Sequence, residues 1–404
     1  MSSFLFALFL LSVGLVLYTY VGYPLVLATI ATLRPRQDSA GPPSKWPFVS
    51  ISLPAYNEEG TIGEALERLL ALDYPADRRQ ILVVSDASTD RTDEVVARYV
   101  DRGVELLRMP KRVGKTGAEN AAAGHLVGDI VVNTDASVRI DTQAIKSLVA
   151  RFEDPSVGLA SGHLVSIDGA AVGSNAGDKG YYGYEMWVRG LESRVCSVVQ
   201  ASGALYAIRL GIHRTPCPAE LTRDTASLVT AWEQGYRTVS VEDAVCHVPR
   251  ARSLRQEYRR KARTFTRGLG TLFYKRHILN PFRHGLFAWM VFSHKLCRWL
   301  VPWGMIAGLL AIAGLSATEA WARWTIGVAS LLSVLALAGW LWPDNRRAPS
   351  KPLSVMAYLA ATNVAVLHAW LNVLRGNTKG IWEPTRRKIE VMHGQSPAHE
   401  SPPR

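Results

Sequence analysis

Cysteine is scarce in this sequence, and its spacing excludes two kinds of site. The 404 residues include only four cysteines, Cys196, Cys217, Cys246 and Cys297. Zinc sites and disulfide frameworks use closely and regularly spaced cysteines, and no Cys-x-x-Cys pair occurs here. Neither a structural zinc ion nor a disulfide-held scaffold is therefore predicted.

Charged side chains are absent from the first 33 residues. The apolar stretch from Phe4 to Leu33 is longer than the roughly 20 residues that a membrane-spanning helix needs. It also exceeds the apolar core of about 7–15 residues in a signal peptide, whose charged start is missing. We expect a retained membrane anchor. Arg34, Arg36 and Lys45 follow it, and positive charge of this kind marks the cytoplasmic end of a span.

Three more segments with little charge lie near the C-terminus, at residues 299–316, 323–342 and 353–374. Each is predicted to be a membrane-spanning helix. The alternative is that two span the membrane and one lies in the interface or re-enters. The stretch Leu286–Leu300 mixes basic and aromatic side chains, which predicts a helix at the membrane surface. The loop around Arg346 is basic and is expected in the cytoplasm. Three spans would then place the basic tail outside the cell, whereas positive charge normally marks the cytoplasmic side. The sequence therefore does not decide on which side the C-terminus lies.

The net charge of +12 has three explanations, namely a nucleic acid, anionic lipid and a substrate diphosphate. Much of the excess lies beside the apolar segments, between Arg250 and His284 and in the loops. No recognised nucleic-acid module is present. We therefore expect a membrane lipid partner and no nucleic acid.

Between the apolar ends, strands and helices alternate. Short runs of Val, Ile and Leu predict strands, and apolar residues at helical spacing predict helices. Buried runs between helices are typical of a mainly parallel α/β sheet, which binds ligands beyond the C-terminal ends of its strands. The predicted strands are 49–53, 81–84, 104–107 and 130–133, and the predicted helices are 59–72, 91–100, 116–127 and 141–152.

Polar clusters end three of these strands, at Pro54–Glu58, Ser85–Asp90 and Asn133–Asp135. A helix cap explains any one of them equally well. Three clusters on the binding edge of one sheet favour a ligand site. Asp86 suits hydrogen bonds from a base or ribose, and Tyr56 offers a ring for stacking.

Phosphate and metal chemistry is indicated at two further places. Lys115 opens a helix in a Gly-Lys-Thr stretch, which suits phosphate, although the longer spacing of a phosphate-binding loop is missing. Asp135 and the Ser137 hydroxyl, with substrate diphosphate and water, suit Mg²⁺ or Mn²⁺, which needs only one or two protein carboxylates.

Later in the chain, Gln200, Ser202 and Gly203 form a small polar stretch that either lets a substrate approach or packs tightly. Asp224 precedes an amphipathic helix and is either its N-cap or a general base. Arg260, Arg263 and Arg267 share one helical face, which suits phosphate or simply lipid head groups.

In this order the motifs PAYNEE, SDASTDRT, GKTGAEN, TDAS, SGALYAIR and RD resemble a membrane-bound family 2 glycosyltransferase over residues 48–270. The flanking apolar segments resemble its synthase-like branch, which includes cellulose, hyaluronan and poly-N-acetylglucosamine synthases. The resemblance implies a GT-A (Rossmann-like) α/β fold on the cytoplasmic side, with flanking transmembrane and interfacial helices.

The same resemblance implies a role for each motif. Tyr56, Glu58 and Asp86 hold the nucleoside, Lys115 lies near the nucleotide, and Asp135 contacts the diphosphate and metal. The 200–203 stretch faces the acceptor, and Asp224 is the base. Two departures stand out. Ser137 replaces a second Asp, and Arg260–Thr264 keeps the Arg but lacks the Gln and Trp of the processive synthases' Gln-x-x-Arg-Trp.

The implied activity is inverting transfer from UDP-N-acetylglucosamine or UDP-glucose to a growing polysaccharide or lipid-linked acceptor, at a bacterial inner membrane, with Mg²⁺ or Mn²⁺. Export or accessory subunits are possible partners. Single transfer to a membrane lipid and a non-catalytic membrane scaffold are the alternatives. The expected organisation is an anchor (1–33), linker (34–47), catalytic domain (48–250), basic and interfacial helices (251–298), membrane segments (299–374) and basic tail (375–404).

Overall fold

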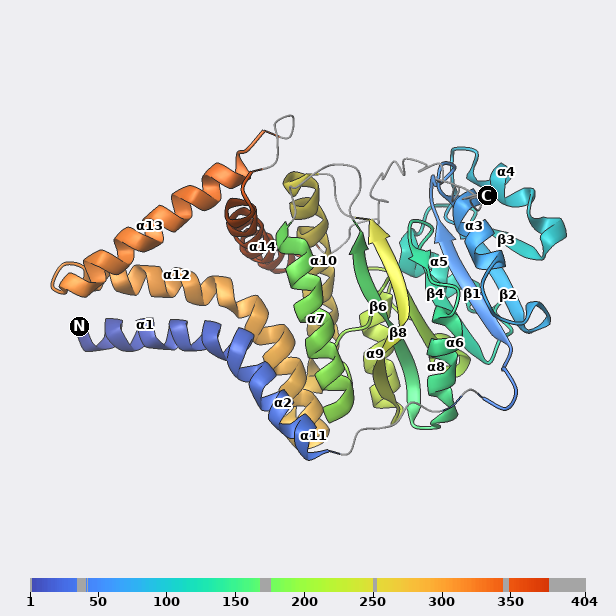
Figure 1. The fold of residues 1–404 in the computed structure, drawn as a ribbon, viewed down its shortest axis with the longest axis horizontal. Coiled ribbons are helices and arrows are strands. Elements are labelled where there is room, and N and C mark those ends of the chain that lie inside the picture. Colours follow the sequence, from blue (N-terminus) through green and yellow to red (C-terminus); the bar gives the residue numbers. More distant parts are fainter. Residues whose placement is uncertain are drawn as a thin grey trace, which may run out of the picture.

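The structure is a computed structural model that describes residues 2–34, 41, 43–167, 176–249, 253–343 and 349–377. A mixed eight-stranded sheet forms the centre of this part of the chain (Figure 1). The strand order across the sheet is β3-β2-β1-β4-β7-β6-β8-β5. The strands are β1 (Val49–Ala55), β2 (Arg79–Ser85), β3 (Val104–Arg108), β4 (Ile130–Thr134), β5 (Arg139–Ile140), β6 (Val157–Ile167), β7 (Leu205–Arg209) and β8 (Arg237–Pro249).

The four strands predicted from the sequence are β1 to β4, and they form the parallel half of the sheet. β1 pairs in parallel with β2 and β4, and β2 pairs in parallel with β3. The expectation of a mainly parallel sheet is right for this half only. β7 starts beside the C-terminal end of β4, where Leu205 pairs with Thr134, so the two strands are antiparallel. β7 is also antiparallel to β6, and β5 to β8, whereas β6 and β8 are parallel.

Helices cover both faces of the sheet and enclose two apolar cores. On one face, side chains such as Leu66 and Ile145 are fully buried against β1 and its neighbours. On the other face the core includes Ala118, Val188 and Leu228. The helices of this central region are α3 (Ile62–Leu70), α4 (Thr92–Ala97), α5 (Gly114–Ala122), α6 (Ala144–Val149), α7 (Ala176–Val195), α8 (Leu210–His213), α9 (Arg223–Glu233) and α10 (Leu254–Tyr274), with short 3₁₀ turns at 76–78, 100–102, 150–153 and 276–279.

Within the described residues, four helical segments are long and apolar enough to cross a membrane: Ser2–Leu33, Pro281–Leu315, Ala320–Trp340 and Lys351–Leu374. The predicted surface stretch Leu286–Leu300 and the predicted span 299–316 largely coincide with one of these segments, Pro281–Leu315. The segments comprise α1 (Ser2–Leu17), a π-helix η1 (Tyr18–Gly22), α2 (Tyr23–Leu33), α11 (Pro281–Val291), a π-helix η6 (Phe292–Cys297), α12 (Arg298–Leu315), α13 (Ala320–Trp340) and α14 (Lys351–Leu374).

The apolar helices are joined to the central sheet through a shared core. Figure 1 shows α1, α12 and α13 extending away from the sheet, with α7 and α10 between them and β6 and β8. The second core contains Tyr23 of α2 and Phe287 of α11 together with sheet residues such as Leu159. This face of the sheet is therefore packed against the apolar helices. Arg346 and most of the predicted basic tail lie outside the described residues.

Candidate active site

A cavity of about 330 Å³ lies at the strand-end edge of the sheet that the sequence analysis singled out. It is bordered by the ends of β4 and β7 and by α5, α7, α9 and α10. All the predicted site residues except Tyr56 and Asp86 line it: Glu58, Lys115, Asp135, Ser137, Gln200, Ser202, Gly203, Asp224, Arg260 and Arg263.

Asp86 lies beside this cavity and organises the loop that precedes α5. Its two carboxylate oxygens accept hydrogen bonds from the backbone N–H groups of Val113, at 2.7 Å, and Gly114, at 2.8 Å. Nearby, the Arg112 guanidinium lies 3.8 Å from the centre of the Tyr56 ring. The structure thus contains the capping role that was the alternative for Asp86. The nucleoside contacts of Tyr56, Glu58 and Asp86 remain predictions.

Lys115 connects two parts of the cavity wall. Its Nζ lies 2.5 Å from Asp135 Oδ1 and donates a hydrogen bond of 3.0 Å to the Gly203 carbonyl. Burial alone would lower the pKa of this ammonium, but the nearby carboxylates of Asp135 and Glu119 outweigh it and raise the pKa above its ordinary value. Lys115 therefore places a fixed positive charge at the end of β4, and its contact with phosphate stays a prediction.

The Asp135 carboxylate and the Ser137 hydroxyl group belong to the same cavity wall. Among the described residues, no three His, Cys, Asp or Glu side chains are grouped so as to hold a metal ion. Mg²⁺ and Mn²⁺ nevertheless accept one or two protein carboxylates when phosphate oxygens and water supply the other ligands. The oxygen donors of Asp135 and Ser137 therefore fit such an ion once a diphosphate is present.

Asp224 lies in the first turn of α9, and it is not the N-cap of that helix. The helix begins at Arg223 after Thr222, and the Asp224 Oδ1 atom accepts a hydrogen bond of 2.8 Å from the Thr225 N–H. A Cβ atom built on Gly203 would lie 2.9 Å from Asp224 Oδ2. The absent side chain at Gly203 thus leaves room for the carboxylate, which faces the cavity as a general base must.

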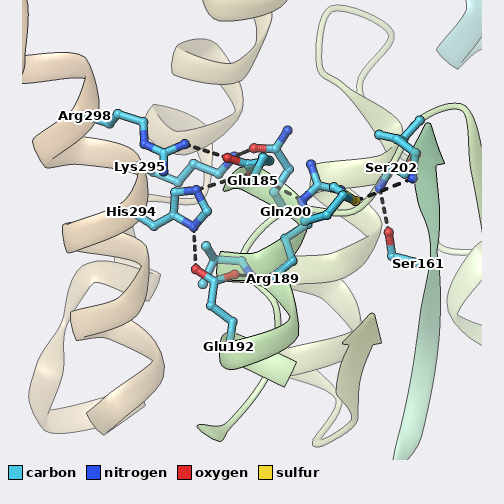
Figure 2. Close-up of polar contacts among 12 residues, drawn as sticks. Ser161, Glu185, Arg189, Glu192, Gln200, Ser202, His294, Lys295 and Arg298 are labelled. Atoms are coloured by element: carbon cyan, nitrogen blue, oxygen red, sulfur yellow. Dashed lines mark hydrogen bonds and ion pairs between the residues drawn. The ribbon is translucent and has the colours of Figure 1, made fainter. Parts of the chain in front are cut away.

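The stretch from Gln200 to Gly203 forms another part of the wall. The Ser202 N–H donates a 2.9 Å hydrogen bond to Ser161 Oγ on β6, and Lys295 donates to the Gln200 side-chain oxygen (Figure 2). Both contacts fix the conformation of the stretch. The stretch is therefore held by β6 on one side and η6 on the other, so the segment predicted to face the acceptor is rigid.

The three arginines of the basic helix α10 have different surroundings. Arg260 donates two hydrogen bonds to Glu257, at 2.6 and 2.9 Å. Arg267 donates to the Leu221 and Ala219 carbonyls and so anchors the loop before α9. Arg260 and Arg263 line the cavity beside Arg267. The three arginines share one helical face, as their spacing predicted. Arg267, however, chiefly binds backbone carbonyls of the loop before α9.

Glu119 is a site residue that the sequence analysis missed. Its side chain on α5 is 1% exposed and lines the cavity, and its Oε1 atom has no hydrogen-bond partner in the described structure. Burial raises the pKa of this carboxyl, although the Lys115 and Arg223 charges oppose the shift. Its position four residues after Lys115 on one helix was the available signal.

Comparison with known proteins gives one family. Residues 50–194 match the family described as Glycosyl transferase family 2. An N-acetylglucosaminyltransferase of Rhizobium meliloti (strain 1021) is 26% identical over 315 residues, which cover 72% of this chain and 70% of the relative. An N-acetylglucosaminyltransferase of Bradyrhizobium elkanii is 34% identical over 124 residues, which cover 30% of this chain and 68% of the relative.

A beta-monoglucosyldiacylglycerol synthase of Synechocystis sp. is 34% identical over 117 residues, which cover 28% of this chain and 24% of the relative. The fold resembles a solved structure, the mannosyltransferase PcManGT from Pyrobaculum calidifontis in complex with GDP-Man and Mn²⁺. The TM-score is 0.69 at 23% identity, and the match covers 91% of this chain and 99% of that one. The chain is a glycosyltransferase with a GT-A fold, and it belongs to glycosyltransferase family 2.

Proposed function

We propose that the chain transfers a sugar from a UDP-sugar to an acceptor hydroxyl at the cytoplasmic face of the membrane, with inversion at the anomeric carbon. The observation that carries this proposal is the position of Asp224. Its carboxylate lies in the first turn of α9 and not at the N-cap position, and it lines the same cavity as Lys115 and Asp135. A base and a phosphate-binding cation thus occupy one site, as a direct displacement requires.

In the proposed reaction, the acceptor oxygen forms a bond to the anomeric carbon while Asp224 takes the hydroxyl proton. The bond from that carbon to the donor diphosphate breaks, and UDP leaves with the electron pair. Lys115 stabilises the negative charge on the leaving diphosphate. A divalent ion held by Asp135 and Ser137 would supply further positive charge there. One displacement from the opposite side of the ring inverts its configuration.

UDP-N-acetylglucosamine is the donor we propose, with UDP-glucose as the second choice. The relatives named N-acetylglucosaminyltransferase support the first. The solved mannosyltransferase holds GDP-Man, so guanine nucleotide sugars belong in any donor panel. Each donor carries a diphosphate, and Lys115 and Asp135 suit that group in every case.

The acceptor is proposed to be a growing polysaccharide or a membrane lipid, since two helices of the cavity wall, α7 and α10, pack against the apolar helix α14. A single transfer to lipid is the second candidate function. The stretch Arg260–Thr264 lacks the Trp that the processive synthases place near their acceptor. The relative named beta-monoglucosyldiacylglycerol synthase also supports a lipid acceptor.

Nucleotide release from the purified full chain tests this function. The protein would be offered a panel of UDP- and GDP-sugars with Mg²⁺, Mn²⁺ or EDTA, and the product size would be recorded. We expect release with one donor, and a loss of about 10²–10⁴-fold in Asp224→Asn. Asp243→Asn changes an exposed carboxylate on β8 and serves as the matched control.

Normal turnover in Asp224→Asn would contradict the assignment of the base. No release from any donor, with membrane lipid extract present, would favour the non-catalytic scaffold instead.

A further inference from the structure

A second cavity of about 110 Å³ adjoins the first on the membrane side of Asp224. The two cavities share wall residues, among them Asp224, Gln200 and Phe265. An acceptor seated in the second cavity could therefore present an oxygen to the base while the donor occupies the first.

Most of the second cavity wall is apolar and comes from helices at the membrane side. Leu228 of α9, Leu272 of α10 and Val291 of α11 contribute to it, with the Trp299 indole of α12. A Cβ atom on Gly268 would lie 3.3 Å from that indole, so this glycine lets Trp299 pack directly against α10. Val291 and Trp299 belong to the long apolar segment Pro281–Leu315. A wall of this kind suits a lipid better than a hydrated sugar chain.

An ion-pair cluster between α7, η6 and the start of α12 borders the polar end of the cavity, and His294, Lys295 and Arg298 of this cluster line that end (Figure 2). Glu185 is paired with Arg298 at 2.7 Å and with Arg189 at 3.3 Å. Its neighbour Glu192 accepts a 2.7 Å hydrogen bond from the Tyr23 hydroxyl and is also paired with His294. Both carboxylates of the cluster are thus already matched.

Lys295 is the cation of this cluster that has no carboxylate partner among the described residues. Its ammonium donates to the neutral Gln200 side-chain oxygen, and Figure 2 shows the two side chains directed toward each other. Lys295 is only partly exposed and lines the second cavity. A charge held away from water without a counter-ion is costly, and an anion bound beside it removes much of that cost.

We propose that the second cavity binds the phosphate-bearing head group of a membrane lipid, and that this lipid is the acceptor of the transferred sugar. The phosphate contacts Lys295, the hydrocarbon chains leave along the apolar wall, and a free oxygen of the head group reaches Asp224. This inference rests on the proposed function and narrows its acceptor class. Where the head group presents a hydroxyl, the new bond to the anomeric carbon forms at that oxygen and the hydroxyl proton goes to Asp224. Where the lipid ends in a phosphate, the bond forms at an ionised phosphate oxygen, which gives up no proton. UDP leaves with the electron pair in either case.

Acceptor preference in a phosphate-free detergent is the test. The full chain would be held in neutral detergent micelles with its donor and one added lipid: phosphatidylglycerol, an isoprenoid monophosphate or neutral diacylglycerol. Glycolipid and released nucleotide would both be measured. We expect transfer to a phosphate-bearing lipid to exceed transfer to diacylglycerol at least tenfold. The first two arms distinguish a phosphodiester head group from a terminal phosphate as the source of the anion.

Lys295 variants give the sharper comparison. Lys295→Gln should lower the preference for the phosphate-bearing lipid over diacylglycerol at least tenfold, and Lys295→Arg should restore most of it. The preference is a ratio within one protein, so a general loss of folded enzyme does not change it. Lys146→Gln removes a partly exposed lysine of α6 that pairs with Asp73, and it is the control.

Equal use of diacylglycerol, or an unchanged preference in Lys295→Gln, would overturn the inference. Nucleotide release without any glycolipid would also overturn it while leaving the sugar-transfer reaction in place. No release in any arm would instead contradict the proposed function itself.

Discussion

The Lys115 ammonium nitrogen lies 2.5 Å from a carboxylate oxygen of Asp135 and 3.0 Å from the carbonyl oxygen of Gly203. One side chain thereby joins the start of α5, the end of β4 and the loop that borders Asp224. Any diphosphate bound near Asp135 must also meet this cation. In the proposed reaction, the contact links donor binding to the position of the loop that is proposed to face the acceptor.

Removing the Lys115 charge should weaken donor binding. A hydrogen bond to a charged group contributes about 1.5–3 kcal/mol, so Lys115→Met should raise the KM for the nucleotide sugar by roughly 10–100-fold. Lys115→Arg keeps the charge and should lose less. Steady-state kinetics on the full chain would measure both. An unchanged KM in Lys115→Met would show that the ion pair only holds the chain together.

A second carboxylate at position 137 should change the use of metal. Ser137 offers one neutral oxygen beside Asp135, whereas an aspartate would add a charged ligand that Mg²⁺ and Mn²⁺ prefer. Ser137→Asp is expected to lower the half-saturating metal concentration about tenfold, from the charge count of the ligands. Titration of activity with Mn²⁺ measures this. Ser137→Asn, similar in size but uncharged, separates charge from bulk, and an equal shift in both variants would contradict the role of charge.

Space at Gly203 should be essential for the base. Because an added Cβ would lie 2.9 Å from Asp224 Oδ2, Gly203→Ala must displace the carboxylate. A displacement of about 1 Å in a reacting group costs about 10²-fold in rate, so kcat should fall by that order while the melting temperature changes little. Gly211→Ala on α8 meets nothing within 4 Å and should leave kcat unchanged. Wild-type kcat in Gly203→Ala would show that the carboxylate can act from another position.

The parallel half of the fold could be predicted because its signals are local. β1 and β4 are short apolar runs, buried along their full length, between amphipathic helices. The other half depends on pairings that no local pattern reveals. The pairing of Leu205 with Thr134, for example, joins residues that are 71 positions apart and reverses the strand direction.

The site shows the same division between local and distant information. Asp135 and Asp224 were predicted because each follows or precedes a recognisable element. Glu119 was missed because it lies within an Ala-rich helix whose pattern indicated packing alone. Lys295 and Gln200 lie 95 positions apart in the sequence, so their contact could be identified only in the folded chain. Charge balance in a cavity is a property of the assembled structure.

Glu119 should make the folded protein less stable as pH rises. Burial raises the pKa of this carboxyl above its ordinary value of 4.5, so the folded chain favours the protonated acid more than the unfolded chain does. The resulting stabilisation is complete below about pH 4.5 and is lost as pH rises through the raised pKa of the folded state. Glu119→Gln imitates the neutral acid at every pH. It should therefore raise the melting temperature by a few degrees on the alkaline side of this window and by little on the acid side.

Thermal unfolding of the full chain in detergent, measured from pH 4 to pH 8 in roughly half-unit steps, would give the two curves. Glu94→Gln removes an exposed carboxylate on α4 and should run parallel to the wild type. If the difference between Glu119→Gln and wild type stays constant across this range, Glu119 does not change its proton occupancy on folding. A donor diphosphate bound near Asp135 would favour the charged form of Lys115 and disfavour that of Glu119, whereas a metal cation there would do the reverse. The measurement is therefore made without either.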